Sequence, residues 1–208
     1  TQGRDAWDRR LNVRLRGRVR LVNQGLEGAC SLDLAGFDRL RDRLDLGLFG
    51  WMETGMFGRR AWFDASFQPF AELPEDAAAM LGQLHPALPM ADWRQVFDTV
   101  AVLARRESGD RRLLEVQGQR EGLRPVTWLV DEASGLVHAV ETAVLVPGMG
   151  MVPRTITFED YREIEGVRLP MRITTDDPGL GRVERVYETW EIDPEIGQEV
   201  FRKHDPAG

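Results

Sequence analysis

The chain has 208 residues, of which 42% are hydrophobic and 29% are charged, and its formal net charge is −7 at neutral pH. This size and balance are typical of one globular domain with a sizeable core, and the negative charge argues against a dedicated nucleic-acid binder, because phosphate backbones would be repelled. The single cysteine, Cys30, excludes an internal disulfide and a cysteine-based metal cluster, and no apolar run is long enough to span a bilayer as a helix.

The first predicted strand is the stretch LNVRLRGRVRL, residues 11–21, in which hydrophobic residues occupy odd positions and arginines occupy even ones. The stretch LEGACSLDL, residues 26–34, alternates in the same way, which predicts a second strand with one apolar face. A two-residue turn at Gln24-Gly25 would place Leu15 opposite Leu34 and Val19 opposite Cys30, and would give Arg16 a carboxylate partner in Asp33. We therefore expect the arginines to form the solvent face of a meander, with contact to an anionic surface as the alternative.

Residues 39–48 repeat the pattern, with leucines at 40, 44, 46 and 48 and charged residues at 39, 41, 43 and 45. Further strands are predicted at 51–56 and 60–64 and between residues 99 and 192. The segments are punctuated by hairpin dipeptides, namely Phe57-Gly58, Gly109-Asp110, Glu121-Gly122, Ser134-Gly135, Glu165-Gly166 and Pro178-Gly179. No helix-length segment separates these strands, so the sheet is predicted to be antiparallel.

Residues 74–97 are the exception. Pro74 suits the first position of a helix, Glu75 and Asp76 suit its positive end, and the residues at 77, 80, 81 and 84 form one apolar stripe that ends at His85-Pro86. A second short helix is predicted over 90–97. Together the two helices amount to about 20 residues, or ~30 Å at 1.5 Å per residue, which is too little to cover a flat sheet of about ten strands. The sheet is therefore predicted to curl into a barrel or half-barrel whose interior is either filled by side chains or left as an apolar pocket.

The segment AVLVPGMGMVP, residues 143–153, contains no charge and no hydroxyl group, and it reads as a flexible link between strands. Links are normally polar and exposed. An apolar link that contains methionine is expected either to fold over the core or to meet a hydrophobic partner.

The order of segments resembles a known family. The stretches GMFGRRAWFD (55–64), DEASGLV (131–137), FEDYREIEGVRLPMRI (158–173) and EIDPEIGQEVF (191–201), with a helical break after the first, are similar to the LolA/LolB-like lipoprotein-carrier superfamily over nearly the whole chain. The resemblance implies a half-open β-barrel with short helices as a lid, an apolar cavity for acyl chains, and a periplasmic or cell-envelope location. The chain begins TQGRDAWDRR, which is not a signal peptide, although processing would have removed one.

The sequence gives little support for a catalytic or metal-binding site. His85, His138 and His204 lie far apart and in no metal-binding spacing, there is no G-x-S-x-G motif, and Cys30 falls on the apolar face of its strand. We therefore expect neither an enzyme, nor a metal, nor another cofactor.

The sequence thus predicts one domain over residues 1–208, mostly β (α+β), built as a strongly curved antiparallel half-barrel of about ten or eleven strands with two short helices as a lid near 74–97. Its expected function is non-catalytic binding of a lipid or acylated protein in the cell envelope, as carrier or receptor. The alternative is an envelope sensor or interaction module that docks a protein partner through its apolar loop. Peripheral membrane contact is compatible with either function, and a membrane span is not.

Two groups of residues are predicted to contact the ligand. The lid group is Met80, Leu81, Leu84, Trp93 and Phe97. The mouth group, on the apolar link, is Val144, Leu145, Val146, Met149, Met151 and Val152.

Overall fold

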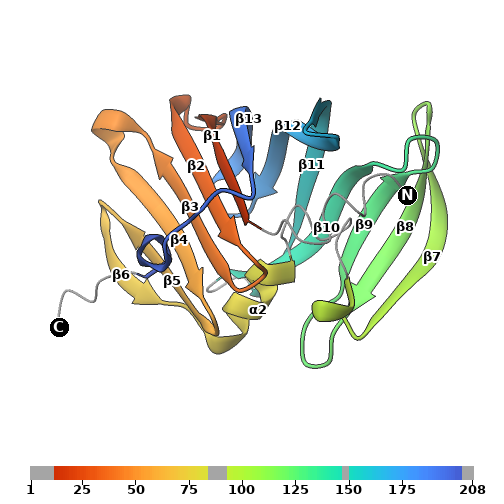
Figure 1. The fold of residues 1–208 in the computed structure, drawn as a ribbon, viewed down its shortest axis with the longest axis horizontal. Helices are drawn as coiled ribbons and strands as arrows, with labels where there is room; N and C mark the ends of the chain where they lie inside the picture. Colours follow the sequence, from red (N-terminus) through yellow and green to blue (C-terminus); the bar gives the residue numbers. More distant parts are fainter. Residues whose placement is uncertain (1–11, 84–92, 147–149, 203–208) are drawn as a thin grey trace.

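The computed structural model describes residues 12–83, 93–146 and 150–202. Its thirteen strands form one antiparallel sheet in the order β6-β5-β4-β3-β2-β1-β13-β12-β11-β10-β9-β8-β7. Strands β1 to β6 form one arm of the sheet. After α2, strands β7 to β13 form the other arm. The two arms meet where β1 pairs with β13 (Figure 1).

The strands in chain order are β1 (Asn12–Leu21), β2 (Leu26–Ala35), β3 (Arg39–Asp45), β4 (Trp51–Phe57), β5 (Arg60–Ala65), β6 (Gln68–Glu72), β7 (Thr99–Ser108), β8 (Arg111–Gln119), β9 (Val126–Asp131), β10 (Val137–Val146), β11 (Gly150–Ile164), β12 (Val167–Asp177) and β13 (Gly181–Ile192). The described helices are α2 (Glu75–Gln83) and three short 3-10 helices, η1 (Gly47–Phe49), η3 (Trp93–Gln95) and η4 (Gln198–Val200).

The mostly β class and the strong curvature are confirmed, and the sheet is open rather than closed into a barrel. The prediction of ten or eleven strands was wrong, since the sheet has thirteen. The short strand β6 has the sequence QPFAE, in which Pro69 obscured the strand pattern; proline is tolerated there because β6 is an edge strand.

The first helix was predicted close to its observed bounds, but the second was not found. Within the described part of 90–97, the chain forms only the 3-10 turn η3, and Val96 and Phe97 are buried directly after it. The strand β7 begins at Thr99, which leaves no room for a longer helix after η3.

The β1–β2 register differs from the prediction by two residues. Leu15 lies opposite Leu32 rather than Leu34, because the connection between Leu21 and Leu26 is four residues long instead of two. A shift of two preserves which side chains share a face, so the predicted faces are confirmed although the pairs are not.

The inner, concave face carries the core. Its buried side chains include Val13 and Leu15 of β1, Leu34 of β2 and Val183 of β13. Close approach of β13 requires glycine at position 17, beside a β-bulge, because a Cβ there would lie 2.2 Å from the carbonyl oxygen of Val186. The helix α2 packs against β3, β4 and β5 at one end of the sheet (Figure 1).

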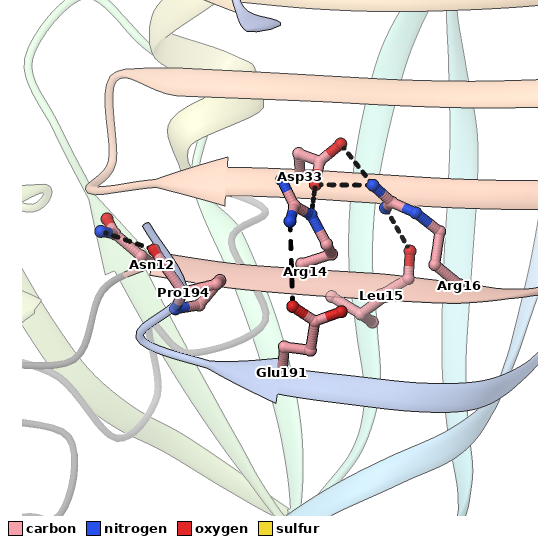
Figure 2. Close-up of polar contacts among 7 residues, drawn as sticks. All are labelled: Asn12, Arg14, Leu15, Arg16, Asp33, Glu191 and Pro194. Carbon is pink, nitrogen blue, oxygen red and sulfur yellow. Dashed lines mark hydrogen bonds and ion pairs between the residues drawn. The ribbon is translucent and has the colours of Figure 1, made fainter. Parts of the chain in front are cut away.

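The outer face carries the arginine row. Figure 2 shows Arg14 and Arg16 of β1 converging on Asp33 of β2, with Glu191 of β13 on the other side of Arg14. The Arg14 Nε donates to Asp33 Oδ1 at 2.8 Å and the Arg16 Nη2 donates to both carboxylate oxygens at 3.0 Å. The expected partner of Arg16 is therefore confirmed, because a long side chain reaches across the altered register.

The apolar segment 143–153 is not a long flexible link. Residues 144–146 of β10 pair with 150–152 of β11, with Val144 opposite Val152, Leu145 opposite Met151 and Val146 opposite Gly150. These pairs form the end of a β-hairpin, so the segment is mostly strand and only its centre, 147–149, lies outside the described residues.

Candidate functional site

A cavity of about 540 Å³ lies on the concave face, between the strands β2–β5 of one arm and β11–β13 of the other. This volume falls within the roughly 300–1,000 Å³ of ordinary small-ligand pockets. Much of its wall is apolar, built from inner-face positions of successive strands: Leu32, Leu34, Leu40, Leu44, Phe63, Ile156, Phe158 and Ile173.

The cavity has two distinguishable ends. One, here called the helix end, is lined by Leu81 of α2, and the neighbouring Gly82 faces the β2–β3 turn at Phe37. The other, here called the turn end, is lined by Gly179 and Leu180 of the β12–β13 turn, which lies against the β1–β2 turn through a hydrogen bond from Gln24 to the Leu180 carbonyl. Strands β1, β2 and β13 are antiparallel to their neighbours. The β1–β2 and β12–β13 turns therefore lie at one end of the sheet, and the β2–β3 turn lies at the other (Figure 1).

Five charged residues line the cavity among these apolar groups: Asp42, Glu53, Arg154, Asp177 and Arg185. The Arg185 Nη2 donates to Asp42 Oδ2 at 2.9 Å, which joins β13 to β3 across the concave face. Burial disfavours the charge of Arg185, but Asp42 and other neighbours outweigh it, so the pKa of Arg185 is raised. The Arg185–Asp42 pair is therefore a stable charged feature of the interior.

The guanidinium group of Arg154 has fewer polar contacts than that of Arg185. Its Nε lies 3.9 Å from Asp177 Oδ2, which is an ion pair but too long for a hydrogen bond. Burial lowers the pKa of Arg154, Asp177 opposes that shift, and the positive charge of Arg185 adds to it. Among the described residues, Arg154 Nε, Arg185 Nε and Asp42 Oδ1 are buried atoms without a hydrogen-bond partner.

The structure separates the predicted lid residues. Leu81 lines the cavity, and Met80 beside it on α2 is half-buried but is not part of the lining. Phe97 packs edge-on against Trp128 of β9 with ring centroids 5.1 Å apart, in the core of the other arm. Trp93 is half-buried against the core, with the Arg94 guanidinium over its ring, and Leu84 lies outside the described residues.

Of the predicted mouth residues, the three whose side chains are described, Val144, Met151 and Val152, are not among those that line this cavity. In the β10–β11 hairpin, Val144 and Val152 fall on the same face as the cavity-lining Ile156, whereas Met151 falls on the opposite face. All three are half-buried. The side chains of Leu145 and Val146 are not described, and Met149 lies outside the described residues.

Sequence reasoning missed the charged residues of the cavity, although the sequence contains a signal for them. Asp42 lies between Leu40 and Leu44 at an inward position of β3. Arg154 and Arg185 likewise stand where the alternation of β11 and β13 calls for apolar side chains. A charge at the apolar parity of three strands predicts a polar site inside the curved sheet.

A larger cavity of about 950 Å³ lies at the helix end, lined by the β2–β3 turn, α2 and the β8–β9 connection. Gly82 and Gln95, which line it, stand on either side of the undescribed segment 84–92, so we place no ligand there. In the part of the chain that the structure describes, no three metal-ligating side chains gather in one place, and no helix is long and apolar enough to cross a membrane.

Comparison with known proteins identifies solved structures of the same fold. A LolA superfamily protein from Nitrosomonas europaea aligns with a TM-score of 0.57 and 15% identity over 97% of this chain and 95% of its own. A domain described as a candidate outer membrane lipoprotein-sorting protein from Vibrio parahaemolyticus aligns with a TM-score of 0.58 and 10% identity, covering 96% of this chain and 93% of its own. A DUF1329 family protein from Desulfovibrio piger aligns with a TM-score of 0.59 and 9% identity over 95% of this chain and 92% of its own.

No protein-family model matches the sequence, and no curated protein matches it. At such low identities the structural likeness concerns the fold. The resemblance to the LolA superfamily that the sequence motifs indicated is therefore confirmed at the level of the fold.

Proposed function

We propose that this protein binds a hydrophobic ligand, the acyl chain of a lipid or of an acylated protein, in the concave cavity, and acts as a carrier or receptor in the cell envelope. The observation that carries this proposal is the cavity of about 540 Å³ whose apolar wall comes from both arms of the sheet and from Leu81 of α2. Its likeness in fold to a LolA superfamily protein and to a candidate lipoprotein-sorting domain supports the same class of ligand and an envelope location.

An acyl chain suits such a wall on energetic grounds. Each methylene group removed from water contributes about 0.8 kcal/mol, so a tail with ten buried methylenes gains roughly 8 kcal/mol before the cost of ordering it. Binding of this kind needs size and apolarity rather than many directed hydrogen bonds. Leu81 is the predicted lid residue best placed to touch the tail, because it lines the cavity, whereas the roles of the half-buried Met80 and Trp93 stay predictions.

A rim of exposed apolar side chains at the turn end supplies a surface for membrane contact. Leu48 and Phe49 of η1 are 105% and 67% exposed, and Phe67 of the β5–β6 turn is 63% exposed. The two segments lie side by side, because the Ser66 N–H donates to the Trp51 carbonyl. Phe67 also lines the cavity, so a lipid surface at this rim would lie next to the bound chain.

The proposal is tested by extracting purified protein with organic solvent, identifying lipids by mass spectrometry, and titrating the delipidated protein with dodecanol. We expect a co-purified acyl compound and saturable dodecanol binding. The Leu180→Asp variant, which places a carboxylate on the cavity wall, should weaken dodecanol binding at least tenfold. The matched variant Leu103→Asp, on the exposed edge strand β7, should leave it unchanged.

A protein that yields no lipid and binds no dodecanol would overturn the proposal. So would equal binding by the Leu180→Asp and Leu103→Asp variants, because the ligand would then bind away from the cavity.

A further inference from the structure

The cavity is not uniformly apolar, and its polar groups are not distributed at random. Asp177 is the last residue of β12 and lies next to the β12–β13 turn, and Arg154 lies beside it, so this pair stands at the turn end. Leu81 of α2 stands at the helix end. The cavity therefore has one end with charged groups and one without.

Arg154 is the cation of this cluster that lacks a close partner. We find no hydrogen bond from it among the described residues, and its sole carboxylate contact is Asp177 at 3.9 Å. Its side chain keeps 22% of its surface accessible while lining the cavity, so a ligand can reach it. Burying a guanidinium group without a hydrogen-bond acceptor costs free energy.

The other acidic groups that line the cavity do not supply Arg154 with an acceptor. Asp42 is engaged with Arg185, and Glu53 forms ion pairs with Arg41 and Arg43. Arg185 adds a second positive charge near Arg154 and has an Nε without an acceptor. The turn end therefore offers two guanidinium groups to a small group with negatively charged oxygens, while Asp42 holds one of them in position.

We propose that the ligand of this cavity is an amphiphile whose anionic head group, a carboxylate or a phosphate, binds to Arg154 beside Arg185 at the turn end, with its tail directed towards Leu81 at the helix end. This inference rests on the proposed function and adds the chemistry and the direction of the ligand. Arg154 binds the head group directly, and Arg185 strengthens the local positive potential.

The test uses the full chain and twelve-carbon probes that differ only in the head group: laurate, dodecyl phosphate and dodecanol, titrated by calorimetry. The unmodified protein should bind laurate or dodecyl phosphate at least tenfold more tightly than dodecanol, as expected for a charge-assisted hydrogen bond. The ratio between the two anions identifies whether the site prefers a carboxylate or a phosphate.

Arg154→Gln should abolish the preference for the anion by weakening the binding of laurate and dodecyl phosphate, whereas Arg154→Lys should retain part of that preference. The matched control is Arg172→Gln, which removes the same charge from the outer face of β12 and should change nothing. Circular dichroism of each variant shows whether it has folded.

Equal binding of all three probes by the unmodified protein, or an undiminished preference in folded Arg154→Gln, would overturn the head-group site while the proposed function stands. Failure of all three probes to bind would overturn both.

Discussion

Cys30 lies on the inner face of β2 and is 4% exposed. Burial raises the pKa of its thiol from 9.0 to about 12, the opposite of the shift that activates a catalytic cysteine. The thiolate, which is the reactive form, is therefore scarce below that pH in the folded protein.

We accordingly predict that native protein at pH 8 reacts with a thiol reagent such as Ellman's reagent far more slowly than protein unfolded in guanidinium chloride. Full labelling of the native protein at the unfolded rate would contradict this description of the core.

Asp33 on the outer face is 4% exposed and accepts hydrogen bonds from two arginines, Arg14 and Arg16 (Figure 2). Replacing it with asparagine removes the negative charge that both guanidinium groups share. We predict that Asp33→Asn lowers the free energy of unfolding by about 1–3 kcal/mol, measured by urea denaturation.

The matched variant is Glu191→Gln, whose carboxylate is 52% exposed and 3.8 Å from the same Arg14. It should cost about 0.5 kcal/mol or less, because water screens an exposed pair. Equal effects of the two substitutions would mean that the buried position of Asp33 is unimportant.

At the scale of single elements, η1 illustrates how an apolar pattern can mislead. Leu46 and Leu48 continue the alternation of β3, but the strand ends at Asp45, Leu46 is buried and Leu48 is fully exposed on η1. Alternation alone cannot locate the end of a strand. Gly47 and Gly50, both with positive φ, provide the local signal for the turn.

The exposed residues of η1 give a prediction about membrane contact. The double variant Leu48→Ser, Phe49→Ser should bind phosphatidylglycerol-containing vesicles several-fold more weakly than the unmodified protein in a co-sedimentation assay. Leu103→Ser removes an exposed leucine from β7, away from the cavity, and should have little effect. If the two variants lose binding equally, or the unmodified protein does not bind vesicles, the rim has no membrane role.

The strand pairs show what could be predicted from the sequence and what could not. Parity assigned Val13, Leu15 and Leu34 to the core, because a period of two fixes the face of each side chain. Parity does not distinguish registers that differ by two residues, so the length of the β1–β2 turn had to come from the structure.

The candidate site was harder to predict, because its residues come from strands far apart in sequence. Asp42 and Arg185 are 143 residues apart, and only the curvature of the sheet brings their side chains together. Each could have been flagged as a charge at an inward position. Their pairing depends on how the two arms face each other, which a single sequence does not specify.

For the whole molecule, the small amount of helix in the sequence predicted a curved sheet, and the sheet is curved. The one described α-helix, α2, packs against β3, β4 and β5 of a thirteen-stranded sheet and cannot cover the rest of its concave face. The sheet covers itself by curling, as expected of so many twisted strands. Between its arms remains the cavity in which we place the acyl chain.

The central claim is that an acyl chain occupies this cavity, and nuclear magnetic resonance with a spin-labelled fatty acid tests it most directly. Paramagnetic broadening should be strongest for the amides of cavity-lining residues such as Leu32, Ile173 and Leu180, and should spare the outer face at Arg18 and the edge strand at Leu103. Broadening confined to the outer face or to β7, or none at a saturating concentration, would contradict the account.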